Sequence, residues 1–155
     1  MTAHLQVTQG MPCPAADVFA LLHDYHRRLE WDTLLRRAET GGDVPAGKGV
    51  RSTCTARAGL GGLAFTTQYM SFDPPRVAAV KLLDPPWPFG SWGASIRHTD
   101  HPDGRGSECT YTMTFTCRPG WAARVLEPVA AWAFRLETAK RLRALAAHLA
   151  GTHRT

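Results

Sequence analysis

Alternating apolar and polar residues dominate the middle of the chain. The pattern is clearest near residue 113, where Cys109, Tyr111, Met113, Phe115 and Cys117 alternate with threonines. Side chains of a strand point to its two faces in turn, so this strand has one apolar face. Short segments joined by turn residues predict an antiparallel sheet of about seven strands with one covered face. The other predicted strands lie near 3–9, 34–40, 50–57, 63–72, 77–83 and 91–98, with a hairpin turn at 58–62.

Helical spacing appears in two places. After the first strand, Ala15, Val18, Phe19 and Leu22 recur every three or four residues, and residues 23–31 continue as a second short helical piece. Residues 121–150 are rich in Ala, Leu and Arg and predict one long terminal helix. Pro128 predicts a kink in its first two turns, or a later start at that residue. The sequence therefore predicts a single α+β domain over residues 1–155, with the long helix covering the sheet.

The long helix is apolar on two sides. One stripe contains Trp132 and Leu136, and the opposite stripe contains Phe134, Thr138 and Leu142. A helix of this kind is covered twice. The second contact is either another part of the same domain, or a ligand cavity or partner subunit that Trp132 and Leu136 face.

Composition narrows the class of protein. With 44% hydrophobic and 20% charged residues, the chain is globular, and no apolar run approaches the 18 residues of a membrane span. The N-terminus does not resemble a signal peptide, and four cysteines without a CxxC pair indicate reduced thiols, so we expect a cytoplasmic protein. The net charge of +5 favours anionic partners. Since no nucleic-acid-binding motif accompanies the arginines, we expect a solvated basic surface and no nucleic-acid partner.

The inward faces of the strands and helix predict an aromatic lining with few hydroxyls. Such a lining suits an apolar ligand held by one or two hydrogen bonds, although a filled core is the simpler alternative. The candidate ligand-binding residues are Ser52, Cys54, Phe65, Tyr69, Trp92, Ile96, Tyr111, Met113, Phe115, Trp132 and Leu136.

Catalytic chemistry is only weakly indicated. Two carboxylates cannot be placed in one pocket, which disfavours paired-carboxylate catalysis. Tyr111 and His98 are the remaining candidates, with His98 as a base. The histidines near 23–26 and 98–101 suit turns better than a metal site, and residues 59–62 lack the spacing of a dinucleotide loop. We therefore expect no metal and no cofactor.

Several short motifs point to a family. They are PAADVFALLHD at 14–24 followed by Trp31-Asp32, DGRGSE at 103–108, and LEP at 126–128 leading into LRAL at 142–145. In element order and in these motifs the chain resembles the START-like or SRPBCC superfamily, which includes polyketide cyclases, coenzyme-Q-binding proteins and pollen-allergen-like carriers. The resemblance implies a helix-grip fold, in which a curved sheet wraps around the C-terminal helix and leaves a cavity for lipids, sterols, quinones or polyketides.

Three functions follow as hypotheses. The first is binding of a small hydrophobic molecule, such as a lipid, a quinone or a polyketide-like compound, between sheet and helix. The second is a polyketide cyclase or dehydratase that acts in the same cavity, as the resemblance implies for some members. The third is a protein-interaction module that uses the stripe at Trp132 and Leu136. Its partner could be a second copy of the chain, which would make a homodimer.

Overall fold

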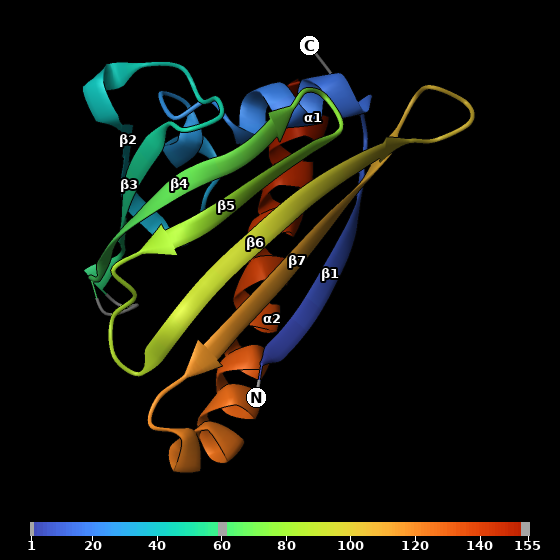
Figure 1. The fold of residues 1–155 in the computed structure, drawn as a ribbon. Helices are drawn as coiled ribbons and strands as arrows, with labels where there is room; N and C mark the ends of the chain where they lie inside the picture. Colours follow the sequence, from blue (N-terminus) through green and yellow to red (C-terminus); the bar gives the residue numbers. More distant parts are fainter. Residues whose placement is uncertain (1, 59–61, 153–155) are drawn as a thin grey trace.

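A seven-stranded antiparallel sheet and one long helix make up most of the computed structural model, which describes residues 2–58 and 62–152 (Figure 1). The strand order is β1-β7-β6-β5-β4-β3-β2. In chain order the elements are β1 Ala3–Met11, α1 Ala15–Leu22, the 3₁₀ helix η1 Arg28–Glu30, β2 Leu35–Thr40, the 3₁₀ helix η2 Gly41–Asp43, β3 Arg51–Ala56, β4 Ala64–Asp73, β5 Val77–Leu83, β6 Phe89–Asp100, β7 Ser107–Cys117 and α2 Gly120–Thr152. The predicted α+β class, strand number and two short helices are confirmed. The hairpin turn predicted at 58–62 lies partly outside the described residues.

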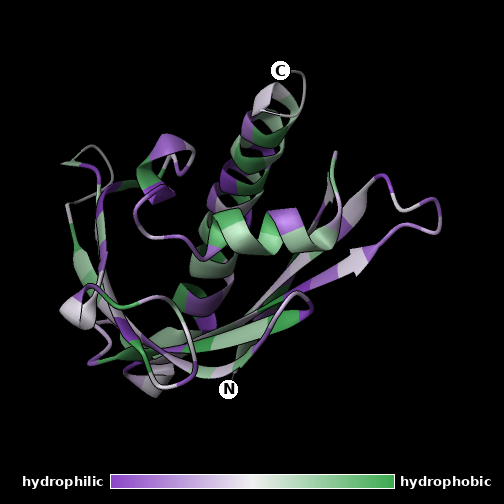
Figure 2. Ribbon diagram, turned by 90° about the horizontal axis from the view of Figure 1, so that it is seen from above, coloured by the Kyte–Doolittle hydropathy of each residue, from purple (hydrophilic) through white to green (hydrophobic). Residues whose placement is uncertain are grey.

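The sheet curves around α2, so its concave face and the helix share one core (Figure 2). Strand β7 pairs with β6 on one side and β1 on the other. Its alternation decides which residues enter the core: Tyr111, Met113 and Phe115 are buried, and the threonines between them face away. The predicted apolar face of this strand is therefore confirmed.

Helix α2 runs without a break from Gly120 to Thr152, with Pro128 inside it. A start at Pro128 is therefore wrong. Pro128 has no N–H to donate to the carbonyl of Arg124, and its side chain is exposed, so the helix continues through it without one of its backbone hydrogen bonds. At 1.5 Å per residue the helix is about 50 Å long, and it packs along β1 and β7.

Only one of the two apolar stripes of α2 faces the sheet. Thr138, Leu142 and Leu145 are buried, whereas Trp132 and Leu136 are 64% and 53% exposed. The prediction that Trp132 and Leu136 line a cavity is therefore wrong. Residues two positions apart on a helix lie on nearly opposite sides, so packing the partly buried Phe134 and the buried Thr138 inward turns Trp132 and Leu136 outward.

The buried side chains of α2 are interrupted by polar groups along its length, and no helix in the described ranges is long and apolar enough to cross a lipid bilayer.

Candidate ligand-binding cavity

A cavity of about 260 Å³ lies between the concave face of the sheet and α2. This volume is just below the range of about 300–1,000 Å³ that is usual for small-molecule sites. Strands β3 to β7, the segment after α1 and the inner stripe of α2 all contribute side chains. The lining residues are Leu22, His23, Tyr25, Arg28, Leu34, Cys54, Ala56, Leu63, Phe65, Thr67, Tyr69, Val80, Leu82, Pro86, Phe89, Trp92, Ile96, Tyr111, Met113, Phe134, Glu137, Thr138 and Arg141.

Most of the predicted ligand-binding residues lie on this wall. Those that line the cavity are Cys54, Phe65, Tyr69, Trp92, Ile96, Tyr111 and Met113. Two others are buried without lining it. Phe115 packs edge-on against Phe89 and Phe134, which form the wall in front of it. Ser52 is hydrogen-bonded to Thr67 and Tyr25, so its hydroxyl is already used.

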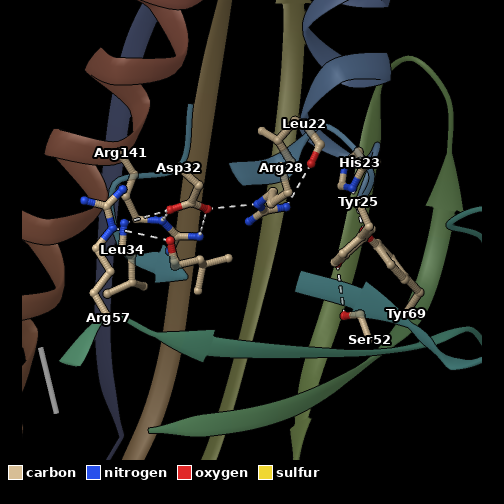
Figure 3. A network of polar contacts seen from close by, with 11 residues as sticks. Leu22, His23, Tyr25, Arg28, Asp32, Leu34, Ser52, Arg57, Tyr69 and Arg141 are labelled. Carbon is tan, nitrogen blue, oxygen red and sulfur yellow. Dashed lines mark hydrogen bonds and ion pairs between the residues drawn. The ribbon is translucent and has the colours of Figure 1, made fainter. Parts of the chain in front are cut away.

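A buried ion cluster borders one part of the cavity (Figure 3). Asp32 accepts hydrogen bonds from Nε of Arg28 at 2.9 Å, and from Nε and Nη2 of Arg141 at 3.0 and 2.8 Å. Burial alone would raise the pKa of the Asp32 carboxyl, but Arg141 and Arg28 outweigh burial and hold that pKa well below its usual range. The cluster therefore stays fully ionised at neutral pH, with two positive charges and one negative charge.

Both arginines line the cavity and keep hydrogen-bonding capacity. Nη1 of Arg28 donates to the carbonyl of Leu22 at 2.8 Å. Within the described ranges, Nη2 of Arg28 and Nη1 of Arg141 have no hydrogen-bond partner. Each guanidinium thus has a spare donor next to an apolar cavity.

Tyr111 and Glu137 add an uncharged donor and an acceptor to the same wall. Burial raises the pKa of the Tyr111 hydroxyl, so it stays protonated and can donate. Oε1 of Glu137 is buried and has no hydrogen-bond partner among the described residues. Glu137 and Arg141 are one helical turn apart on α2, which places their Cβ atoms about 5–6 Å from each other. A donor and an acceptor therefore line the cavity from neighbouring turns of the same helix.

A second polar group closes the cavity near α1. The hydroxyl of Tyr69 lies 2.7 Å from Nδ1 of His23 and 3.2 Å from the hydroxyl of Tyr25. Burial, then Arg28 and His98, lower the pKa of His23 well below its usual range. His23 is therefore neutral, and it also lines a wider surface pocket on the other side, between α1 and residues 40–46. The His23–Tyr25–Tyr69 group separates that pocket from the inner cavity.

His98 does not line the cavity. Its ring packs edge-on against Phe19, and both ring nitrogens are buried without a hydrogen-bond partner in the part of the chain that is described. A base must reach the proton that it removes. The hypothesis that His98 is a catalytic base therefore does not fit its position.

The burial of His98 predicts an acid-sensitive fold. Burial lowers its pKa to about 4, so as the pH falls the unfolded chain takes up a proton before the folded one. The neutral, buried His98 therefore costs the folded state nothing above about pH 6.5. Between about pH 6.5 and pH 4 the free energy of unfolding falls by about 3 kcal/mol. Urea unfolding across this range should show the loss. His98→Phe should reduce the pH dependence and leave the part that the buried His23 contributes, whereas His4→Gln, on the exposed surface, should not change it. Equal slopes in all three proteins would contradict this explanation.

No group of three or more His, Cys, Asp or Glu side chains that could hold a metal ion is found in residues 2–58 and 62–152. All four cysteines are free and buried, and burial raises the pKa of Cys54, the cysteine on the cavity wall. Its thiol therefore behaves as a small apolar side chain.

Sequence reasoning missed the charged part of the site. Asp32 and Arg141 are 109 residues apart in the sequence, and arginines and aspartates are usually exposed. Two signals were available. Arg28 and Asp32 are four residues apart, and Glu137 and Arg141 follow Phe134 on the inner stripe of α2 at spacings of three and four.

The chain matches a known family profile over residues 2–150. The profile is described as polyketide cyclase / dehydrase and lipid transport. The chain belongs to this family. Its membership supports a ligand-binding or cyclase role and leaves the ligand open. A search of curated protein sequences finds no relative.

Several solved structures have a similar fold. The protein XoxI from Bacillus cereus superposes with a TM-score of 0.77 at 15% identity, covering 97% of this chain and 98% of that one. The Zhui aromatase/cyclase from Streptomyces sp. R1128 gives 0.77 at 18% identity, covering 96% and 94%. The di-domain ARO/CYC StfQ from the steffimycin biosynthetic pathway gives 0.82 at 12% identity, covering all of this chain and 53% of that one. At these identities the likeness shows the helix-grip fold alone.

Proposed function

We propose that this family member binds a small, mostly apolar molecule of one or two rings that carries a hydroxyl or enol oxygen. The observation that carries the proposal is the composition of one cavity wall. An apolar lining of about 260 Å³ is joined there by the spare donors of Arg28 and Arg141, the hydroxyl of Tyr111 and the unpartnered Oε1 of Glu137.

Physical chemistry favours an occupied site over a filled core. A buried carboxylate oxygen without a partner costs free energy, and a ligand hydroxyl that donates to Glu137 would recover it. The same hydroxyl oxygen can accept from Arg141 or Tyr111. The remaining surface of such a ligand would meet side chains such as Trp92, Ile96 and Met113, which reward apolar contact.

Two probes of one shape test the proposal. 2-Naphthol offers a hydroxyl that donates and accepts, whereas 2-methoxynaphthalene only accepts. Since a hydrogen bond to a charged group contributes about 1.5–3 kcal/mol, we expect 2-naphthol to bind at least about tenfold tighter in a fluorescence titration. Glu137→Leu should remove this preference. Equal binding of the two probes by the wild-type chain, or binding of neither, would refute the proposed ligand class.

A second candidate function is a cyclase or dehydratase reaction in the same cavity. It is favoured by a specific arrangement, namely arginine and tyrosine donors that could stabilise an enolate oxygen and a carboxylate on the same wall that could accept a proton.

The reaction makes a prediction that binding alone does not. With a polyketone substrate, Tyr111→Phe should lower kcat at least tenfold, because one donor to the enolate oxygen is lost. His98→Ala should leave kcat unchanged. Turnover that survives both Tyr111→Phe and Glu137→Gln would rule out this reaction and leave ligand binding as the function.

A further inference from the structure

The outer face of α2 carries an uncovered apolar stripe. Its five members follow one another at spacings of four, four, three and four residues, which keeps them within about one quarter of the helix circumference. They are Trp121, Val125, Val129, Trp132 and Leu136, and all are more than half exposed. Soluble surfaces seldom align this many large apolar side chains without a partner.

The charges beside the stripe have one sign. Between residues 118 and 152 the exposed charged side chains are all basic, namely Arg118, Arg124, Arg135, Lys140 and Arg143. The two acidic residues of this segment turn inward, since Glu127 is buried and Glu137 lines the cavity. An apolar stripe with tryptophans and basic flanks has the composition of a helix that lies in the surface of an anionic membrane.

A further tryptophan is held at the same end of the molecule. Trp87, in the loop between β5 and β6, is 79% exposed. The carbonyl of Pro88, which follows Trp87 in the sequence, accepts a hydrogen bond from the backbone N–H of Arg118. This bond fixes the loop beside the start of α2, where Trp121 is 83% exposed (Figure 1). The neighbours of Trp87 in that loop, Pro86 and Phe89, line the ligand cavity.

We propose that the outer face of α2, together with Trp87, docks onto the surface of a membrane that contains anionic lipids. Tryptophan suits the region of the lipid headgroups because its ring is apolar and its N–H is polar. Each basic residue near an anionic surface adds to the attraction. A second copy of this chain is a poorer occupant, because a symmetric dimer through the stripe would bring the two basic sets together.

Docking would bring the loop that lines the cavity to the lipid surface, where apolar molecules are dissolved. The proposal does not depend on the ligand class, since the stripe and the cavity lie on opposite sides of α2 and can be altered separately.

Vesicle co-sedimentation of the full chain tests the docking. With vesicles containing about 30% phosphatidylglycerol in phosphatidylcholine, at about 50 mM salt, the chain should partition at least about tenfold more strongly than with phosphatidylcholine alone. Binding should weaken at about 500 mM salt because the charges are screened. Trp121→Ser/Trp132→Ser and Arg124→Glu/Arg135→Glu should each lower the partition coefficient at least about tenfold.

Control variants distinguish binding through this face of α2 from binding that depends only on the net positive charge of the protein. Met70→Ser removes another exposed apolar side chain, and Arg51→Glu/Arg97→Glu changes the net charge by the same amount on the sheet. Both should bind anionic vesicles as the wild type does. The proposal is overturned if the wild type stays in the supernatant at low salt, if these controls weaken binding as much as the α2 variants, or if the tryptophan variant instead disperses a dimer seen by sedimentation.

Discussion

Asp32→Asn is expected to lower the free energy of unfolding by about 3–5 kcal/mol. The change is almost isosteric, so the loss comes from charge and not from packing. It leaves Arg28 and Arg141, whose side chains are about nine-tenths buried, without the carboxylate that both of them contact. Chemical denaturation monitored by circular dichroism measures the effect directly.

Two variants make the Asp32 result specific. Asp43→Asn removes an exposed carboxylate beside His26 and should change stability by less than about 0.5 kcal/mol. The triple variant Arg28→Met/Asp32→Leu/Arg141→Met removes the whole cluster and should be more stable than Asp32→Asn, since no unpaired charge remains buried. A loss below about 1 kcal/mol in Asp32→Asn would mean that water or another group already compensates the arginines.

The cluster is a costly way to hold a fold together, which suggests a use beyond stability. Buried ion pairs are often no better than apolar side chains of the same size. Here two guanidinium groups are fixed by one carboxylate, and each retains a donor beside the cavity. We regard Asp32 as a positioning residue for the proposed ligand site, because it sets the direction of both arginines.

Arg141→Met is expected to weaken 2-naphthol binding by about 10–100-fold. Methionine keeps most of the length and apolar contact of the arginine side chain while removing its charged donors. Arg143→Met is the matched control: it lies two residues further along α2, is exposed, and should leave the dissociation constant unchanged. If Arg141→Met binds 2-naphthol as tightly as the wild type, the arginine is not part of the site.

Local patterns predicted the fold well because the fold depends on them. The alternation in β7 decided which of its residues enter the core, and helical spacing located α1 and α2. The same local information could not decide which stripe of α2 faces the sheet. One stripe has Trp132 and the other has Phe134, so both are apolar in sequence. Only the packing of Thr138 and Leu142 against the sheet shows which stripe faces inward.

The polar part of the site depends on long-range contacts. Asp32 and Arg141 meet across 109 residues, and nothing in either local sequence requires the other. The position of His98 also depends on a contact that is distant in the sequence. Its position in β6 suggested a base, but the neighbouring Phe19 on α1 closes over its ring.

The most direct test of the account is whether a ligand enters the space between sheet and helix. Three methionines lie in the described residues, and of these only Met113 lines the cavity; Met11 is in the core and Met70 is exposed. In a chain labelled with ¹³C at the methionine methyl groups, 2-naphthol should shift the Met113 methyl resonance and show nuclear Overhauser contacts to it, because the naphthalene ring lies beside it. A ligand that binds while the Met113 methyl stays unmoved, or that shifts Met70 instead, would contradict the account.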